Sequence, residues 1–468
     1  MNEEFELKGI WWFPDNPEET FFGTLIFNPY KGAFLELLDF HKKLKIDVPT
    51  EKEIILGISS DGNKITLHGC YCYNNNKYFT TYHFSSYIIF IGAHFHKTED
   101  IKFKNITVHY SYLDEWFNIS GFHIDDSKIK DPNMNEIIIK YKTLESVNIF
   151  LNNNYKLTLY VTEYTDNERT QVNIKRKTFI NIEFNQEESI ANIFIILRGI
   201  RNFLSFALSE KVYLISIEGV LEENNGITEE NFYNEKVKIY YKIAGISKVT
   251  EKVNPNNILF KFHDISDRFE IILNKWLNKA SSLEIFFNLY FEIIYNSGIH
   301  LEHKFLNLIL ALEAYHRKTK ENFELPEDKF KDMLDEIVNF VPEKYKSWLR
   351  EKLNYSNEKN LRRRLKEIMD EFSYAISLFI QDENIKHFID KVIKTRNYLI
   401  HKDDKIEKNV AKDKELFYLV EKLKLIVEIC ILKELGFTQD EIKDKVHKIS
   451  NRLKNIHYFS SSQIIRNI

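Results

Sequence analysis

Three polar side chains of different chemistry lie close together near the end of one expected helix. The segment "TRNYLIHKD" places Arg396, Asn397 and His401 in a row of six residues. On an α-helix Asn397 and His401 are four residues apart and share a face. Arg396 lies about 140° around the axis and about 7.5 Å along it from His401, so its long side chain can lean toward the same groove.

This combination suits the cleavage of RNA without a metal ion. In that reaction the 2′-hydroxyl attacks the adjacent phosphorus, a base takes its proton, and an acid protonates the departing 5′ oxygen. Histidine can serve as base or acid near neutral pH, and arginine stabilises the charged phosphorane with its planar fork of donors. One chain supplies one such histidine, so a two-fold dimer would supply both the acid and the base at one seam.

The spacing by itself has little specificity. The chain holds 15 histidines, and the same Arg-x4-His spacing recurs at Arg452 and His457. A similar Arg-Asn pair, Arg201 and Asn202, has Phe206 in the position of the histidine. The alternative interpretation is an ordinary helix C-terminus, where basic side chains interact favourably with the helix dipole.

A second polar group, "EAYHR", lies at the end of an upstream helix. Glu313, His316 and Arg317 could orient Arg396 or contact a substrate. Glu313 and Arg317 are four residues apart, so an ordinary helix ion pair worth roughly 0.2 to 0.5 kcal/mol explains them equally well.

A basic cluster between residues 343 and 366 is a candidate RNA-binding surface. Nine basic residues face three acidic ones there, and the arginines are Arg350, Arg362, Arg363 and Arg364. Phosphate contacts from such a cluster would be independent of base sequence and sensitive to salt. The alternative is a solvated helix face. Trp348 and Tyr355 could add base stacking, although buried anchoring is the commoner state of a tryptophan.

Two pairs of metal-ligand residue types favour strand packing over a metal site. Cys70 and Cys72, and likewise His94 and His96, alternate by two residues, as neighbours on one face of a strand do. Structural zinc sites more often use a Cys-x2–4-Cys loop. We therefore expect no metal and no cofactor. The aromatic run from Trp11 to Phe13 is likewise more typical of a core than of a ligand clamp.

The totals describe a folded chain with more than one domain. It has 468 residues, of which 44% are hydrophobic, and a formal net charge of -4. That length corresponds to two to four domains at roughly 150 residues each, and any nucleic-acid binding must come from a local patch. Three cysteines, an acidic N-terminus and the absence of a long apolar run predict a cytoplasmic protein without a membrane partner.

The hydrophobic period divides the chain into two parts. Short runs rich in β-branched and aromatic residues, such as "FFGTLIFN" and "EIILGISS", are typical of strands up to about residue 185, and their close spacing implies antiparallel pairing. A helix is expected near 188–209, and the stretch around Asn254 to Asn256 is the best linker. Helices are expected over 267–296, 300–318, 327–340, 343–355, 359–379, 384–401, 411–435 and 438–450. The predicted fold class is α+β, with a β-rich domain over 1–255 and a helical domain over 265–468.

Several segments together resemble a known family. "KTRNYLIHKD" resembles the Arg-Asn-x-x-x-His signature of HEPN domains, and "LILALEAYHRKTK" resembles the partner helix of ApeA-like HEPN domains. The segments "GIWWFPDNPEETFFGTLIFNPYKGAFLELL", "LGISSDGNKITLHGC" and "ITVHYSYLDEWFNISGF" are similar to the ApeA N-terminal domain. They follow the expected order and span nearly the whole chain.

The resemblance implies a bacterial anti-phage protein of abortive infection whose helical domain is an endoribonuclease. It implies direct catalytic roles for Arg396 and His401, with help from Asn397, and a homodimer formed through the HEPN domain. The expected substrate is RNA, with tRNA as a candidate. From the two-domain architecture alone, the N-terminal domain is expected to sense a phage-derived trigger or to restrain the nuclease. Some HEPN domains only bind nucleotides or proteins, so a non-catalytic module of a defence or toxin–antitoxin system stays the alternative.

Overall fold

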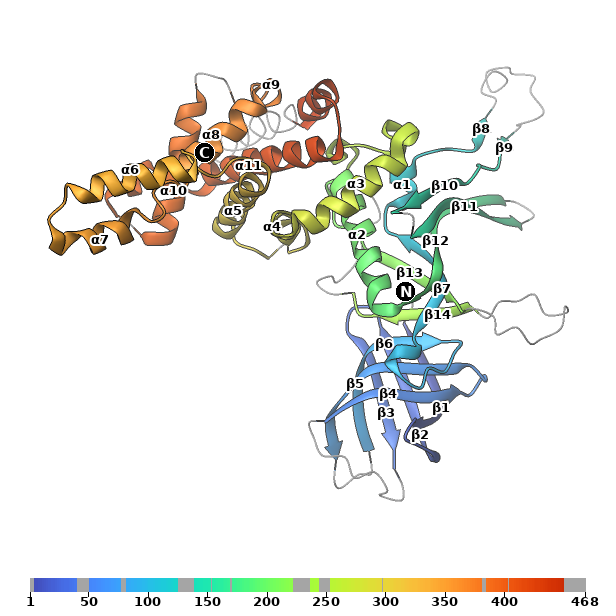
Figure 1. Ribbon diagram of the computed structural model, residues 1–468. Coiled ribbons are helices and arrows are strands. Elements are labelled where there is room, and N and C mark those ends of the chain that lie inside the picture. Colours follow the sequence, from blue (N-terminus) through green and yellow to red (C-terminus); the bar gives the residue numbers. More distant parts are fainter. Residues whose placement is uncertain are drawn as a thin grey trace, which may run out of the picture. The chain divides into compact units, whose positions relative to one another are not determined.

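The protein folds into two compact units, Met1–Asn274 and Lys275–Ile468. The structure is a computed structural model, shown in Figure 1. It describes residues 4–39, 50–76, 81–124, 139–152, 154–168, 171–221, 236–243, 253–296, 298–380, 384–402 and 404–449. The first unit is rich in antiparallel strands and the second is helical, as the sequence predicts.

The first six strands of the N-terminal unit close into an antiparallel barrel. Their order is β6-β3-β2-β1-β4-β5, and β5 pairs again with β6, so this part of the sheet has no free edge. Alternating buried and exposed residues along β2 and β3 match a sheet with one face on a core. The strands are β1 (Phe5–Phe13), β2 (Asn16–Asn28), β3 (Gly32–Leu38), β4 (Thr50–Ser59), β5 (Lys64–Asn76) and β6 (Thr81–Ile91).

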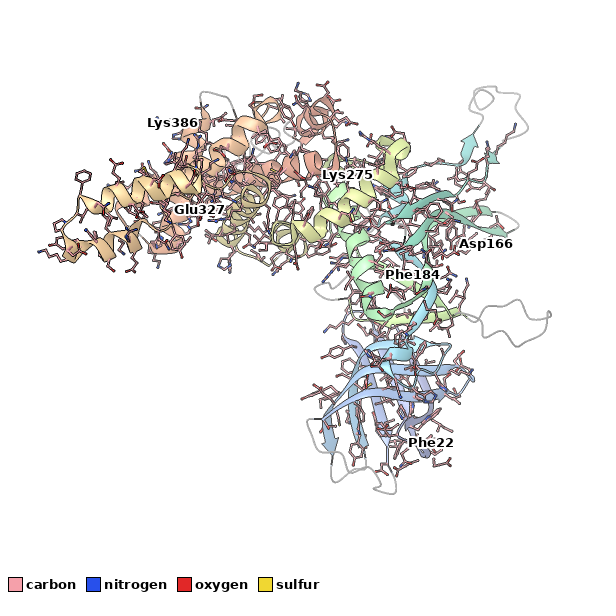
Figure 2. All side chains as sticks on the ribbon, viewed as in Figure 1. Phe22, Asp166, Phe184, Lys275, Glu327 and Lys386 are labelled. Atoms are coloured by element: carbon pink, nitrogen blue, oxygen red, sulfur yellow. The ribbon has the colours of Figure 1, made fainter. Side chains whose placement is uncertain are left out.

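The barrel core is built around Trp11, which is fully buried. Gly57 on the neighbouring strand lies against its ring, and a Cβ added there would come within 2.3 Å of the indole. Cys70 and Cys72 belong to the same core, and burial raises the pKa of the Cys70 thiol to about 12. Phe22, labelled in Figure 2, lies on β2 between buried neighbours and is exposed on the outer face.

The sheet continues from β6 into a second group of strands in the order β14-β13-β7-β12-β11-β10. Helix α2 packs against β7 and β12 of this group. The elements are β7 (Lys102–Tyr110), β10 (Val147–Leu151), β11 (Tyr155–Glu168), β12 (Gln171–Ser189), β13 (Leu214–Val220), β14 (Lys236–Tyr241), the separate pair β8 (Phe122–Ile124) and β9 (Ile139–Tyr141), α1 (Leu113–Phe117) and α2 (Ile190–Leu208).

Helix α2 begins at the predicted place because Ser189 caps it. The Ser189 hydroxyl accepts a hydrogen bond from the Asn192 N–H over 3.4 Å. Contrary to the expectation from apolar runs, one helix in the described part of the chain, α2, is long and apolar enough to span a membrane. Half of that window is buried inside the protein, and core helices of soluble proteins pass the same test.

The expected linker around Asn254 is part of the N-terminal unit instead. The Leu259 N–H donates to the Ala207 carbonyl over 2.8 Å, and Phe262 and Phe269 pack against the ring of Trp116. The three short 3-10 turns of this segment are Pro255–Asn257, Phe262–Asp264 and Ser266–Arg268. These contacts explain why the division between the units falls later in the chain than the predicted 255–265.

The helical unit has a core of three helices joined by buried polar contacts. On α4 the Tyr290 hydroxyl donates to Glu428 Oε1 over 2.9 Å, and on α5 the Tyr315 hydroxyl donates to Glu434 Oε1 over 3.0 Å. Both glutamates lie on α11. The helices are α3 (Phe269–Ser282), within which the division between the units falls, α4 (Glu284–Tyr295), α5 (Leu301–Thr319), α6 (Glu327–Asn339), α7 (Glu343–Leu353), α8 (Leu361–Glu371), α9 (Ser373–Ile376), α10 (Ile385–His401) and α11 (Asp413–Leu435), followed by a helix over 439–449.

Two of the expected helices are broken in the structure. The predicted helix over 267–296 is interrupted at Leu283, and the one over 359–379 is interrupted at Phe372. The other predicted bounds agree within a few residues. Gly436 ends α11 in the left-handed conformation with φ 88°.

Candidate active site

Helix α10 presents the predicted catalytic residues at its C-terminal end. Its buried face holds Phe388, Ile389, Val392 and Thr395. Arg396 and Asn397, on the next turn, are half-buried, and His401 is exposed as the last residue of the helix. The His401 imidazole, in solvent, and the half-buried Arg396 guanidinium therefore lie at the same end of one helix.

The guanidinium of Arg396 is held by its neighbour in sequence. Arg396 Nη1 donates to Asn397 Oδ1 over 3.2 Å. The same contact occurs on α2, where Arg201 Nη2 donates to Asn202 Oδ1 over 3.2 Å. Phe206, the equivalent of the histidine there, is buried in the core. The Arg–Asn contact is therefore a local property of helices, and the accessible histidine is what distinguishes α10.

The end of α10 is fastened to the chain that follows it. The hydroxyl of the buried Thr395 accepts a hydrogen bond from the Ala411 N–H over 3.0 Å. Lys402 ends the helix in the left-handed conformation, and its N–H donates to the Tyr398 carbonyl. Sequence reasoning missed Thr395, although a threonine inside a helix next to the motif is a recognisable signal.

A second tie involves the Glu407 carboxylate. It accepts a hydrogen bond from the Tyr398 hydroxyl over 3.4 Å and pairs with Lys412 Nζ over 2.6 Å. The hydrogen bond from Lys412 lowers the pKa of Glu407. Together with the bond at Thr395, this contact fixes the return from α10 to α11 beside the motif.

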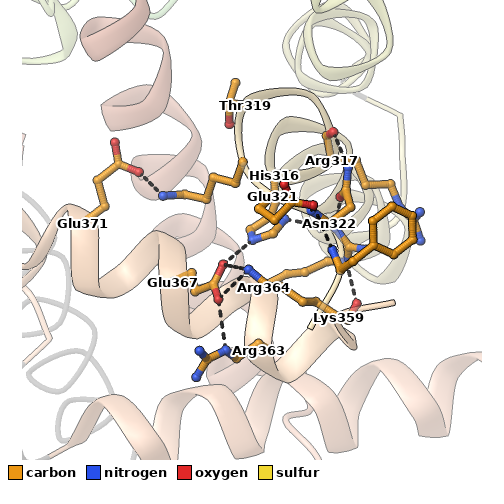
Figure 3. A network of polar contacts seen from close by, with 12 residues as sticks. His316, Arg317, Thr319, Glu321, Asn322, Lys359, Arg363, Arg364, Glu367 and Glu371 are labelled. Atoms are coloured by element: carbon orange, nitrogen blue, oxygen red, sulfur yellow. Dashed lines mark hydrogen bonds and ion pairs between the residues drawn. The ribbon is translucent and has the colours of Figure 1, made fainter. Parts of the chain in front are cut away.

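Two of the predicted supporting residues, His316 and Arg317, lie in a polar network between α5 and α8, shown in Figure 3. His316 is fully buried, and its Nε2 lies 2.8 Å from Glu367 Oε2. Its Nδ1 lies 3.0 Å from Arg364 Nη1. Both ring nitrogens are occupied by protein groups, so His316 is not available for acid–base chemistry with a substrate.

Glu313 and Arg317 form an ion pair on the surface of α5. Arg317 Nη2 lies 3.4 Å from Glu313 Oε1, and Arg317 Nη1 lies 2.9 Å from Glu358 Oε2. Neither residue has a contact with Arg396 among the described interactions. The structure therefore supports the alternative interpretation, in which Glu313 and Arg317 form an ordinary ion pair along one helix.

The arginines of the basic cluster each have an acidic partner. Arg350 pairs with Asp335 over 2.7 Å, Arg363 pairs with Glu367 over 2.9 Å, and Arg362 pairs with Asp390 of α10. Asp335, Glu367 and Asp390 lie outside the window over which the sequence predicts a positive charge, so the surface is less basic than that count suggests. Arg350, Arg362 and Arg363 remain about half exposed.

Arg364 does not belong to an RNA-binding surface in this structure. It has no exposed surface, its Nε donates to the Lys359 carbonyl over 2.8 Å, and its Nη1 donates to Asn322 Oδ1 over 2.6 Å. Burial lowers the pKa of the guanidinium. We correct the prediction accordingly: Arg364 joins α5 and α8 and has no surface to offer a phosphate.

Cys70 and Cys72 are neighbours on strand β5, as expected, whereas His94 and His96 follow the end of β6 and do not lie on a strand, so the expected strand packing is wrong for the histidine pair. Cys70 and Cys72 are buried in the barrel, and His94 Nε2 contacts the Gly57 carbonyl over 2.8 Å. In the described part of the chain, no group of three or more His, Cys, Asp or Glu side chains could hold a metal ion. Arg452 and His457 lie outside the described residues.

Comparison with family models accounts for both units. The model of the ApeA N-terminal domain 1 matches residues 6–276, more than half of the chain, and the model of the Apea-like HEPN domain matches residues 306–441. The chain belongs to the ApeA-like HEPN family. The HEPN match includes most of α5 and all of α10 and therefore contains Arg396, Asn397 and His401. None of the curated proteins and none of the solved structures compared with the chain matches it.

Proposed function

We propose that this ApeA-like HEPN protein is a metal-independent endoribonuclease that acts in anti-phage defence by abortive infection. The observation that carries the proposal is the exposed His401 at the end of α10, one turn beyond the half-buried Arg396. The family supports a role in defence. The chemistry and the RNA substrate, with tRNA as a candidate, are the proposal.

The roles follow from what each side chain can do. A His401 imidazole takes the proton of the 2′-hydroxyl as its oxygen bonds to phosphorus. The bond from phosphorus to the 5′ oxygen breaks, and a protonated imidazole gives that oxygen a proton. Arg396 stabilises the phosphorane oxygens, and Asn397 holds the guanidinium. The products are a 2′,3′-cyclic phosphate and a 5′-hydroxyl end.

One imidazole cannot be protonated and unprotonated at once, so we propose that two HEPN units meet and supply one histidine each. Ile400, beside His401, is 49% exposed and would be covered in such a seam. The N-terminal unit would restrain or release the nuclease on contact with a phage-derived trigger, a proposal that rests on the two-domain architecture.

The test uses purified full-length protein and total tRNA in the presence of EDTA. Wild type should cut the RNA and leave cyclic phosphate ends, while Arg396→Ala and His401→Ala should lose cutting and keep their folding. Equal cutting by all three proteins would show that Arg396 and His401 are not the catalytic residues. Lysate from phage-infected cells supplies a trigger if the wild type needs one.

The rival is a HEPN module that binds a nucleotide and cuts nothing. One observation favours it: a cavity of about 670 Å³ lies between α10 and α11 and is lined by His387, Lys391, Tyr418 and Lys422 among others. Its size is within the range of small-molecule sites, and burial lowers the pKa of Lys422. Thermal stabilisation by ATP that Lys422→Ala abolishes, with no RNA cutting in infected lysate, would favour the rival.

A further inference from the structure

Helices α6 and α7 form a hairpin with little core of its own. In Figure 1 they run side by side at one end of the helical unit, and Glu327, labelled in Figure 2, is the first helical residue of the hairpin. Val338 is the one buried residue of α6, and α7, described throughout, has none. An ion pair of 2.7 Å between Arg350 and Asp335 joins the two helices.

The base of the hairpin is firmly closed. The buried Asn357 receives a hydrogen bond from the Leu325 N–H on its Oδ1 and donates to the Leu325 carbonyl through Nδ2, each over 2.9 Å. The Lys359 N–H donates to the Asn322 carbonyl over 2.9 Å. These bonds hold both ends of the segment together, so the hairpin is a fixed projection of the HEPN unit.

The outer face of α7 combines cations with exposed aromatic rings. Lys344, Trp348 and Lys352 are spaced by four residues and form one stripe on α7, and Tyr355 follows in the turn after the helix, which ends at Leu353. Trp348 is 58% and Tyr355 is 72% exposed. Lys344 and Lys352 have no ion pair in the described part of the chain, and Lys344 Nζ lies 4.7 Å from the ring centre of Tyr345. The expectation that Trp348 is a buried anchor is wrong.

Burial of a large apolar side chain is favourable by about 1.5 to 3 kcal/mol, so stacking with a partner would stabilise the exposed rings of Trp348 and Tyr355. We infer that the stripe formed by Lys344, Trp348, Lys352 and Tyr355 is a docking platform for single-stranded RNA. Bases stack on the rings and phosphates contact the ammonium groups. The inference deepens the proposed nuclease function by assigning a surface that holds its substrate.

The charges of the stripe favour RNA over a second copy of the chain. In a two-fold contact centred on Trp348, Lys344 of one chain would face Lys352 of the other, and opposed like charges are destabilising. The neighbouring helix α6 carries Asp332, Asp335 and Glu336 on its surface, which an anionic membrane would repel. A single-stranded RNA is flexible, so its bases can stack on the α7 face while its phosphates stay away from the acidic side chains of α6.

The test measures binding and does not depend on cutting. Full-length His401→Ala protein is titrated into an end-labelled single-stranded RNA of about 20 nucleotides, and anisotropy is followed at several salt concentrations. A second substitution in this parent protein, Trp348→Ala, should weaken RNA binding about tenfold relative to the parent. Trp348→Phe in its place should retain most of the parent's affinity. Adding Lys344→Ala with Lys352→Ala should lower the slope of log affinity against log salt by about 1.4, at about 0.7 per phosphate.

The matched control removes two lysines from the other helix of the same hairpin, through Lys329→Ala with Lys331→Ala. It should bind within twofold of the parent. The inference would be overturned if the Trp348→Ala and Lys344→Ala/Lys352→Ala variants bound RNA within twofold of the parent. It would also be overturned if the control lost as much RNA affinity as these variants. A change of mass in light scattering for Trp348→Ala, with RNA affinity unchanged, would assign the stripe to self-association instead. Wild-type cutting judges the proposed function separately.

Discussion

Arg364 Nη1 donates a hydrogen bond to His316 Nδ1 over 3.0 Å inside the helical unit. Because a guanidinium can only donate, this nitrogen of the imidazole must be unprotonated. The other nitrogen, Nε2, faces the carboxylate of Glu367 over 2.8 Å and therefore carries the proton. The contacts fix one neutral tautomer of His316, so the network joins α5 to α8 and leaves neither ring nitrogen free for a substrate.

The first prediction concerns Glu367, which also pairs with Lys359 over 3.0 Å and with Arg363 over 2.9 Å. Glu367→Gln should lower the free energy of unfolding by about 1 to 3 kcal/mol, because His316 and Lys359 lose a charged acceptor. Denaturant unfolding of the full chain measures it. Asp440→Asn, which changes an exposed acid on the same unit, should shift stability by less than about 0.5 kcal/mol. Equal effects would mean that the network contributes no more than a surface pair.

The second prediction is that this network is sensitive to acid. Burial lowers the pKa of His316 below its usual 6.5. Burial raises the pKa of Glu367, but hydrogen bonds from His316 and Lys359 outweigh it and bring the pKa to about 2. In both cases the unfolded chain binds the proton more tightly than the folded chain. Stability is therefore lost as the pH falls below about 6.5 for His316 and from about 4.5 toward 2 for Glu367.

The variant that tests this sign is His316→Gln, which can keep a donor toward Glu367 but cannot take up a proton. The melting temperature of the wild type should fall more steeply between pH 7 and pH 5 than that of the variant. Parallel pH profiles would show that His316 is not the group that titrates. Because other histidines are common to both proteins, the difference between the two profiles isolates this one.

The third prediction concerns Thr395, the buried residue before the motif. Thr395→Val preserves the shape of the side chain but removes the acceptor of the Ala411 N–H. An unpaired buried N–H should cost about 1 to 3 kcal/mol of stability. Cutting should fall as well, since the end of α10 loses one of its two ties to the chain that follows. Thr319→Val is the matched control, because the Thr319 hydroxyl only donates to the Tyr315 carbonyl within its own helix.

The local parts of the fold could be predicted from the sequence, because they depend on neighbours in the chain. The spacing of Phe388, Ile389, Val392 and Thr395 defines one buried face of α10, and its bounds differ from the prediction by one residue at the N-terminal end. Gly436 ends α11 for an equally local reason. The placement of Arg396, Asn397 and His401 on one helix follows from the same pattern.

Distant pairings could not be predicted. The barrel closes because β5 pairs with β6 and β1 pairs with β4, and no turn signal specifies the second of these pairs. The charge of the basic cluster was misjudged for the same reason, since Asp335 and Asp390 come from other helices. Whether His316 is exposed or buried depends on α8, which lies far from it in sequence.

The fourth prediction separates the charge of Arg396 from its shape. Arg396→Lys keeps a cation but loses the planar fork that matches two phosphate oxygens. Cutting should fall at least about tenfold, with an unchanged melting temperature, because the half-buried side chain carries little packing. Arg201→Lys changes the equivalent Arg–Asn pair on α2 and should leave cutting unchanged. Full activity of Arg396→Lys would mean that charge alone suffices at this position.

The fifth prediction tests whether two copies of the motif act together. Wild type is mixed with increasing amounts of His401→Ala protein, and the chains are allowed to exchange before cutting is measured. If a seam needs His401 from both chains, only pairs of wild-type chains cut, so an equal mixture keeps about a quarter of the activity of the same total amount of wild type. Independent chains would keep about a half. As a control, wild type is mixed with Tyr87→Ala protein, which changes an exposed residue of the N-terminal unit, and this mixture should keep the full cutting activity. Light scattering reports the mass of the protein in each mixture. A cutting activity that is proportional to the wild-type fraction would show that one His401 suffices. A monomeric mass with full activity would show the same. The general acid would then have to be sought elsewhere on the same chain.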